Sequence, residues 1–508
     1  MKFKFTKKLA VLLSTLLVSS VFYSCGPGLD VFNLAVPATL NPAAGLDISP
    51  ASGAIGTLVT LTGVDFSTFQ SISIGGVAAI PINYSSTSLT AMVMPGAASG
   101  FANVVTTSGS YDSSTAFTIT AVGTPVTQQG SMLVGTGAVG AATQGISVAV
   151  SADGNTALIG GRADNASVGA SWVFTRSAGV WSQQGTKLVG TGAVGSSRQG
   201  TSVSLSADGN TALIGGFTDN GGTGGIGASW VFSRSAGVWS QQGSKLIGTG
   251  AVGGAQQGNS VALSADGNTA LIGGNFDNTN IGASWIFTRS TGVWSQQGTK
   301  LVGTGAVGSS RQGTSVSLSA DGNTALIGGY LDNTYVGATW VFTHSAGVWS
   351  QQGSKLVGTG AIGTAFQGSS VSLSADGNTA LIGGFLDNTN IGASWVFIRT
   401  AGVWSQQGSK LVGTGAIGTA GQGNRVSLSA DGNTALIGGT DDNSGIGASW
   451  LFTRSAGIWS QQGSKLVGTV AVTSYQGSGV ALSADGNTAL VGGTNDNSGI
   501  GASWVFVP

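Results

Sequence analysis

Apolar and polar positions recur in one fixed order over residues 126–508. In one copy, residues 199–209 alternate between apolar and small polar side chains, and residues 211–216 form an uninterrupted apolar run. Alternation with a period of two is typical of a half-buried strand, and a short continuous run is typical of a strand buried on both faces. Two segments rich in valine and tryptophan follow at residues 228–232 and 238–246. Each copy therefore predicts four antiparallel strands joined by Gly-containing turns.

This four-strand pattern occurs seven times, and each copy is marked by a Gln-Gln-Gly triplet. The spacing between triplets is 55 residues, with a single spacing of 58, and they begin at Gln128, Gln183, Gln241, Gln296, Gln351, Gln406 and Gln461. A fixed period of this length is typical of a propeller or a solenoid. The last copy ends after its third strand, whereas residues 126–133 match a fourth strand with no copy before them. We therefore predict that residues 126–508 form a seven-bladed β-propeller closed by its N-terminal strand.

Residues 46–120 show a different pattern, in which short predicted strands are separated by turns. Pro50, Gly53, Gly56 and Gly63 punctuate alternating apolar runs, a pattern typical of an immunoglobulin-like β-sandwich. The run P-x-S-G-x-x-G-x-x-V-T-L-T-G-x-x-F resembles the IPT/TIG family, and the resemblance implies a spacer or interaction module without catalytic residues. Residues 121–125 are predicted to be a linker. The predicted fold class is all-β: a small Ig-like β-sandwich followed by the propeller.

The N-terminal segment predicts export. Four lysines precede an apolar run at residues 9–23, as in a secretory signal peptide. Cys25 follows two residues after this run and is the single cysteine of the chain, and the residues before it resemble a bacterial lipobox. That resemblance implies a signal peptide at residues 1–24, lipid attachment at Cys25 and a lipidated tether at residues 25–45. We expect anchoring in the bacterial cell envelope, at the outer membrane or cell surface; the alternative is an ordinary signal peptide with an incidental cysteine.

The repeats also carry a motif that resembles a known repeat family. The run Q-G-T-S-V-S-L-S-A-D-G-N-T-A-L-I-G-G, at residues 199–216, resembles the FG-GAP repeat, a relative of which builds the propellers of integrin α-subunits. Some integrin copies hold Ca²⁺, but here only one aspartate of the loop remains, so we expect no metal site and keep weak Ca²⁺ binding open. The alternative role of this aspartate is structural, because it can close its own turn as an Asx turn. The aspartates at this position of the seven copies are Asp153, Asp208, Asp266, Asp321, Asp376, Asp431 and Asp485.

The loops that differ among the copies predict the ligand-binding face. The second-to-third-strand loop and the copy-to-copy loop vary, and strand order places both on the same face. An Asp-Asn pair stays in the first of these loops in every copy, and its aspartates are candidate ligand contacts, although turn chemistry explains them as well. They are Asp164, Asp219, Asp277, Asp332, Asp387, Asp442 and Asp496.

The charge and the residue types of the chain argue against several classes of function. From Cys25 onward, 15 Lys+Arg stand against 19 Asp, a net charge near −4, which argues against nucleic acid as a partner. The chain has no Glu, and its one histidine, His344, falls in a predicted turn. We therefore expect no enzyme, no catalytic residues and no cofactor.

Three functions remain open. The favoured one is a monomeric surface binding or adhesion protein, held to the membrane by its lipid anchor and contacting an extracellular protein or glycan. The alternatives are a multivalent lectin and a passive structural repeat protein. Aromatic residues in the variable loops suit sugars, though only some copies have them: Phe276, Tyr330, Tyr335 and Phe385.

Overall fold

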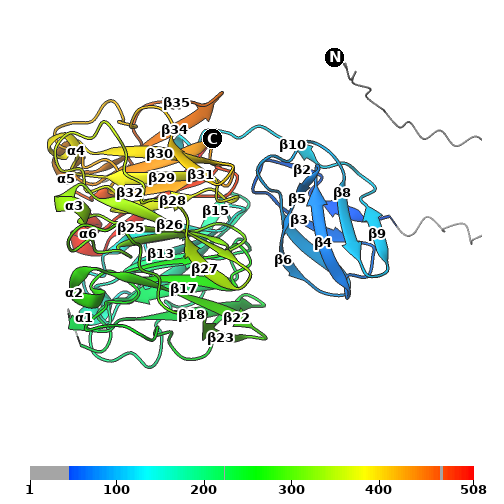
Figure 1. Cartoon of the computed structure of the whole chain (residues 1–508), viewed down its shortest axis with the longest axis horizontal. Helices are drawn as coiled ribbons and strands as arrows, with labels where there is room; N and C mark the ends of the chain where they lie inside the picture. The colour runs from blue at the N-terminus through cyan, green and yellow to red at the C-terminus, as the bar shows by residue number, and fades with distance from the viewer. Residues whose placement is uncertain (1–44, 222–223, 470–472) are drawn as a thin grey trace, which may run out of the picture. The chain divides into compact units, whose positions relative to one another are not determined.

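The computed structural model describes residues 45–221, 224–469 and 473–508. The predicted signal peptide, Cys25 and almost all of the predicted tether lie outside the described residues. Within them the chain is an all-β protein, with an Ig-like β-structure followed by repeated four-stranded sheets (Figure 1). No helix in this described part is long and apolar enough to cross a membrane.

The Ig-like part consists of two four-stranded sheets and one small parallel pair. The first sheet has the order β1 (Asp47–Ser49), β3 (Leu58–Thr62), β7 (Ser88–Met92) and β6 (Ile80–Tyr84). The second has the order β5 (Val77–Ala78), β4 (Phe69–Ile74), β8 (Ala102–Thr106) and β9 (Gly109–Asp112). β2 (Ser52–Gly53) pairs in parallel with β10 (Thr118–Ile119).

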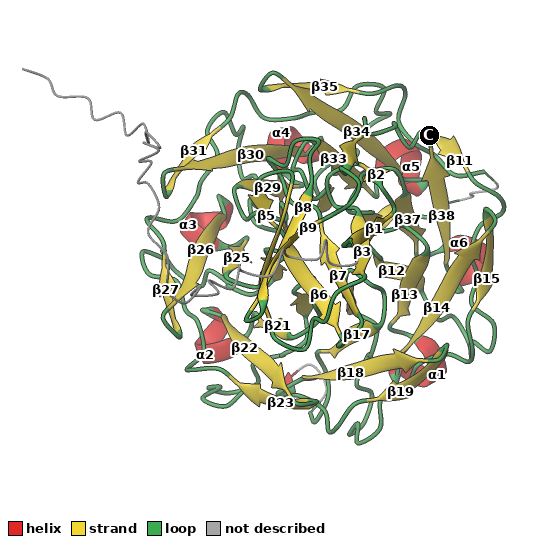
Figure 2. Cartoon of the chain, turned by 90° about the vertical axis from the view of Figure 1, so that its right-hand side faces the viewer, coloured by secondary structure: helices red, strands yellow, loops and turns green. Residues whose placement is uncertain are grey.

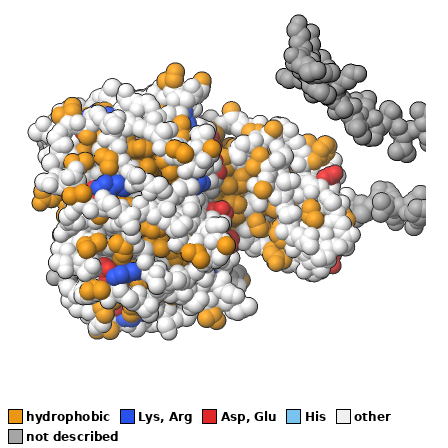
Figure 3. Space-filling model, in the orientation of Figure 1, with side chains coloured by type: hydrophobic (Ala, Val, Ile, Leu, Met, Phe, Trp, Pro, Cys, Tyr) orange, Lys and Arg blue, Asp and Glu red, His pale blue; other side chains and the backbone are white. Residues whose placement is uncertain are grey.

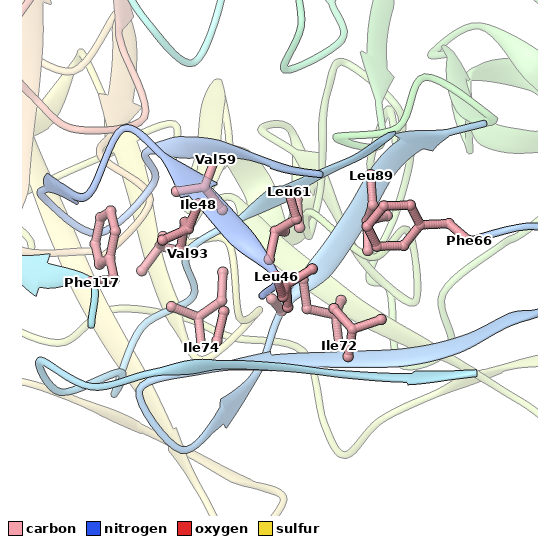
Figure 4. Packing of buried hydrophobic residues seen from close by; sticks show 14 residues of the cluster. Leu46, Ile48, Val59, Leu61, Phe66, Ile72, Ile74, Leu89, Val93 and Phe117 are labelled. Atoms are coloured by element: carbon pink, nitrogen blue, oxygen red, sulfur yellow. The ribbon is translucent and has the colours of Figure 1, made fainter. Parts of the chain in front are cut away.

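The core of this part lies between its two sheets. Alternate residues of β3 point inward, so that Val59 and Leu61 are fully buried while their neighbours are exposed or half-buried. They pack with Ile74 of the second sheet and with Phe66 and Phe117 (Figure 4). This is the inward–outward alternation expected of a β-sandwich.

Seven four-stranded antiparallel sheets follow, and we number them one to seven. Each is listed from its first to its fourth strand. Sheet one is β12 (Gln144–Val150), β13 (Thr156–Gly161), β14 (Ala170–Ser177), β15 (Val180–Gln183); sheet two is β16 (Ser202–Leu205), β17 (Thr211–Gly216), β18 (Ala228–Ser235), β19 (Val238–Gln241); sheet three is β20 (Ser260–Leu263), β21 (Thr269–Gly274), β22 (Ala283–Ser290), β23 (Val293–Gln296); sheet four is β24 (Ser315–Leu318), β25 (Thr324–Gly329), β26 (Ala338–Ser345), β27 (Val348–Gln351); sheet five is β28 (Ser370–Leu373), β29 (Thr379–Gly384), β30 (Ala393–Thr400), β31 (Val403–Gln406); sheet six is β32 (Arg425–Leu428), β33 (Thr434–Gly439), β34 (Ala448–Ser455), β35 (Ile458–Gln461); sheet seven is β36 (Gln476–Leu482), β37 (Ala489–Gly493), β38 (Ala502–Val507), β11 (Thr127–Gln128).

The two ends of the repeat region meet in sheet seven. β11 pairs antiparallel with β38, with Thr127 opposite Val507. The first strand of each sheet contacts the first strand of the next, and β36 of sheet seven contacts β12 of sheet one. Figure 2 shows the sheets arranged around a common centre in this order.

Tryptophans of the third strands form the core between sheets. The seven third-strand tryptophans are fully buried, and Trp285 packs in one cluster with Leu213 and Val231 of the preceding sheet. Its indole Nε1 donates to the carbonyl of Thr249 at 2.8 Å. A Cβ on Gly248 would lie 2.1 Å from the indole Cδ1, so only glycine leaves room for this ring.

The fourth strands are shorter than the sequence predicted. β19 ends at Gln241, and Gly243, with φ +69°, turns the chain before Leu246 returns as an isolated bridge to Ser229. The third strands are longer than predicted, so His344 lies in β26 and not in a turn. There it stacks on Trp349 as the arginines of the other complete sheets stack on their tryptophans.

The loops after the second strands contain short left-handed turns. In α1 (Asp164–Ser167), Asn165 and Ala166 have φ of +48° and +53°, so this is no regular α-helix. Asparagine tolerates the left-handed region better than most residues because its side chain can bond locally. The equivalent turns are α2 (Asp277–Asn280), α3 (Asp332–Tyr335), α4 (Asp387–Asn390), α5 (Asp442–Gly445) and α6 (Asp496–Gly499).

The Ig-like part packs against one end of the first strands. Ile82, Met92 and Met94 form one buried cluster with alanines of the first-to-second-strand turns, namely Ala152, Ala207, Ala265, Ala375 and Ala430. Gly123 also donates its amide to Asn487 Oδ1 at 2.7 Å. The loops that differ among copies lie at the opposite end of the same strands.

Candidate ligand pocket

The aspartates predicted as ligand contacts are buried, and six of them are ion-paired. In sheet two, Asp219 accepts the amide of Val194 on Oδ1 at 2.7 Å and the ammonium of Lys245 on Oδ2 at 2.5 Å. The same two contacts recur at Asp164, Asp277, Asp332, Asp387 and Asp442. In each pair at most 1% of the aspartate side chain is exposed.

These contacts join the two variable loops of one sheet to its fourth strand. The aspartate lies in the loop after the second strand, its backbone partner lies in the loop before the first strand, and the lysine follows the fourth strand. Both carboxylate oxygens are therefore engaged within the protein. The geometry gives these residues a structural task, and their role as direct ligand contacts stays a prediction.

Sheet seven departs from this arrangement. Its fourth strand comes from the N-terminal copy of the motif, in which Met132 occupies the position of the lysine. Asp496 is 4% exposed and accepts a hydrogen bond from Ser474 Oγ at 3.2 Å. Sheet seven thus has a methionine at the sequence position that holds the ion-paired lysine in the other six sheets, and Met132 packs against the hydrophobic cluster around Trp504.

Met132→Lys is expected to raise the free energy of unfolding by about 1–2 kcal/mol, because it restores a charge-assisted hydrogen bond to a buried carboxylate. The measurement is the urea midpoint of the variant beside that of the wild-type protein. An unchanged or lower midpoint would show that the ion pair of the other sheets does not transfer to sheet seven.

The aspartates of the first-to-second-strand turns close those turns. Asp208 Oδ1 accepts the amide of Asn210 at 2.9 Å and the hydroxyl of Ser206 at 2.6 Å. A carboxylate bonded to the amide two residues on is an Asx turn. In the described ranges, no three His, Cys, Asp or Glu side chains are grouped to hold a metal ion.

A pocket of about 400 Å³ lies among the first strands, at the end that carries the variable loops. We call it the central pocket. Six of the seven sheets line it, through the start of a first strand or the residue after a second strand. Its lining residues are Ile146, Ser147, Arg162, Thr201, Ser202, Asn259, Ser260, Asn275, Thr314, Ser315, Val316, Tyr330, Ser369, Ser370, Val371, Phe385, Asn424 and Arg425.

Two arginines in this lining break the repeat. Arg425 occupies the first-strand position that holds serine in sheets one to five, and Arg162 follows a second strand at the position of Tyr330 in sheet four. At Arg162's position the other sheets have Phe217, Asn275, Phe385, Thr440 and Thr494. Near-identical sheets thus surround an asymmetric pocket.

The two guanidinium groups lack an acidic partner in the pocket. Burial lowers the pKa of Arg425, and the charge of Arg162 lowers it further. Burial and the nearby Arg198 lower the pKa of Arg162 in the same way. None of the ion pairs between described residues involves either arginine. Arginine stays protonated despite such shifts, so the pocket holds two positive charges.

Aromatic rings form one side of the pocket. Tyr330 and Phe385 line it, and both contact Phe366, with ring centroids 5.5 and 5.6 Å apart. Tyr335 stacks on the same Phe366 at 5.3 Å. Of the four aromatic candidates named from the sequence, Tyr330 and Phe385 reach the pocket, whereas Phe276 lies under the guanidinium of Arg311 at 4.4 Å.

Comparisons with known proteins bear on the Ig-like part. Residues 46–121 match the family model of the IPT/TIG domain. This match supports the Ig-like part that the sequence predicted. A comparison with curated proteins finds no match. Among solved structures, the chain is similar to one described as Kuenenia stuttgartiensis hydrazine synthase, with 11% identity, 74% of this chain and 97% of that chain covered, and a TM-score of 0.46. A likeness of this degree supports no conclusion about function.

Proposed function

We propose that this chain is a non-enzymatic binding and adhesion protein of the bacterial cell surface. Its repeats would form a seven-bladed β-propeller of the FG-GAP type that contacts an extracellular protein or glycan with its variable-loop face. Cys25 would carry the lipid anchor in the cell envelope, and the IPT/TIG domain would serve as a spacer. The protein would act as a monomer without a cofactor.

The cyclic order of the first strands supports the propeller. β36 contacts β12, and β11 completes the sheet of β38, so no sheet of the series is left with three strands. The chain departs from the FG-GAP pattern at two positions, with Gln199 in place of phenylalanine and Gly216 in place of alanine. Gln199 is fully buried, accepts the amide of Gly190 and donates to its carbonyl, so here the position fixes the loop before the first strand.

The observation that carries the binding function is the position of the central pocket. The sheets are near-copies over most of their length, and the variable residue after the second strand lines this pocket in sheets one, three, four and five. Binding residues are commonly carried on variable positions of a rigid scaffold. The pocket volume lies within the roughly 300–1,000 Å³ of small-ligand sites. Its lining supplies cations, amides, hydroxyls and aromatic rings, which are groups suited to recognition.

One observation favours a lectin among the binding proteins. Tyr330 and Phe385 present rings beside the hydroxyls and amides of the first strands. An apolar ring face next to hydrogen-bonding groups suits the two kinds of surface that a sugar presents. Such a lectin would have one asymmetric sugar site in the central pocket. The repeats alone suggest seven equivalent sites.

The test is binding of the full-length protein, purified in a mild detergent, to arrays of glycans and extracellular proteins. The double variant Tyr330→Asn and Phe385→Asn copies Asn275 of sheet three at both positions, so it should fold. We expect at least one bound ligand, recovered chemically unchanged, whose affinity falls about tenfold or more in this variant.

The matched control is Arg289→His, which copies His344 at the opposite end of a sheet and should bind as the wild type does. Blank arrays, equal loss in the control or chemical conversion of the ligand would each contradict the proposed function.

A further inference from the structure

Two arginines without an ion pair line the central pocket of a weakly charged protein. Charged residues make up 7% of the chain, and few appear on the face in Figure 3. The six lysines after the fourth strands are neutralised by the buried aspartates. Arg162 and Arg425 have no such partner, and they line the same cavity.

Placing two like charges in one concave site is unfavourable unless an anion offsets them. Arg425 donates from Nη1 to the carbonyl of Asn424 at 2.9 Å, which satisfies one donor and leaves its charge uncompensated. Buried or half-buried charges in proteins are normally paired, because desolvation of an unpaired charge is costly. The lowered pKa values of both arginines reflect this cost. An anionic group between the two guanidinium groups would offset this desolvation cost.

The remaining lining is suited to a hydroxylated ring. Tyr330 and Phe385 provide an aromatic side for the pocket. Asn275 is 6% exposed, and its Oδ1 has no hydrogen-bond partner among the described residues. A buried acceptor of this kind is costly to leave unsatisfied. A ligand hydroxyl can donate to it, which chloride or sulfate cannot do.

The acidic residue to consider at this end of the sheets is Asp441. It occupies the position of Phe276 in sheet six and is exposed. Its carboxylate lies beside Gly421, where an added Cβ would be 3.3 Å from Oδ2, and it accepts the hydroxyl of Thr440. Asp441 is absent from the pocket lining, so it does not neutralise the two arginines by direct contact.

We propose that the central pocket binds one acidic sugar, a hexose ring that carries an anionic group. The anion lies between Arg162 and Arg425, the ring packs against Tyr330 and Phe385, and a hydroxyl donates to Asn275. This inference rests on the proposed binding function of the same face and adds the ligand class and a stoichiometry of one. A planar guanidinium binds carboxylate and phosphate alike, so both anions belong to the class.

The experiment is calorimetric titration of the full-length protein with glucuronate, galacturonate and glucose 6-phosphate. Glucose and succinate serve as a ring without charge and a charge without a ring. We expect one ligand per chain, tighter binding of at least one acidic sugar than of either reference compound, and weaker binding at higher salt. Comparison of the two uronates with glucose 6-phosphate shows whether the site binds a carboxylate or a phosphate more tightly.

Two variants copy residues that this chain already uses at the same positions. Arg425→Ser reproduces the serine of sheets one to five, and Arg162→Thr reproduces Thr440 and Thr494. Each is expected to weaken acidic-sugar binding about 10- to 100-fold, as for a lost charged hydrogen bond. Arg289→His should leave it unchanged.

Each contrary outcome overturns a distinct statement. Equal binding of glucose and glucuronate, unaffected by the arginine variants, would refute the anion site while leaving a binding function for this face. Equal binding of succinate would refute the sugar ring and indicate an acidic peptide or small acid. Several ligands per chain would refute the single site. No binding of any acidic sugar would overturn this inference, and blank arrays in addition would overturn the proposed function.

Discussion

Asp277→Ala is expected to lower the free energy of unfolding by about 3–5 kcal/mol, as for the loss of one partner of a buried ion pair. The change removes the acceptor of the Val252 amide at 2.7 Å and leaves Lys300, whose side chain is 19% exposed, without its carboxylate at 2.5 Å. The measurement is chemical denaturation followed by tryptophan fluorescence, because the buried indoles report on the sheets.

Asp441→Ala is the matched control, since Asp441 lies in the equivalent loop of sheet six but is exposed. It should change stability by no more than about 0.5 kcal/mol, as is usual for surface positions. If Asp277→Ala left stability unchanged and abolished ligand binding, the loop aspartates would be ligand contacts and their structural interpretation would be wrong.

Trp285→Ala should likewise destabilise the protein by about 3–5 kcal/mol, the usual cost of removing a large buried aromatic side chain. Trp285 is fully buried between sheets two and three, and its indole donates to the Thr249 carbonyl at 2.8 Å. Truncation would leave a cavity and an unsatisfied carbonyl at the same place. The urea midpoint of this variant should be lower than that of any surface variant.

Trp294→Ala, in the fourth strand of the same sheet, provides the comparison. Trp294 is half-buried, lies under the Arg289 guanidinium at 5.3 Å and donates to Gln242 Oε1 at 3.1 Å. Its loss is expected to cost about 1–2 kcal/mol, since a partly exposed ring leaves no closed cavity. Equal losses at the two tryptophans would contradict the assignment of the third-strand tryptophans as the core.

The strands and their order follow from the sequence because each copy repeats the same local pattern. The continuous apolar run at residues 211–216 became β17, buried at every position, and residues 126–133 supplied β11 as the fourth strand of sheet seven. The bounds were less accurate. The period-2 pattern cannot show that Gly243 ends the fourth strand or that the third strand extends through His344.

The side chains that line the pocket could not be predicted from the pattern that the repeats share. The ion pairs join residues that are 23 positions apart, as in Lys300 and Asp277, or 26 apart in sheet two, and only the folded loops bring them together. Arg162 and Arg425 are 263 positions apart in the chain. The available sequence signal was the comparison of copies position by position, which identifies both arginines as exceptions, but only the structure shows that they line one cavity.

The most direct test of the account is a crystal structure of the protein soaked with the tightest-binding acidic sugar. The account predicts electron density for one sugar in the central pocket, with its anionic group between Arg162 and Arg425 and its ring against Tyr330 and Phe385. Sugar bound at equivalent places on several sheets, with the central pocket empty, would contradict it.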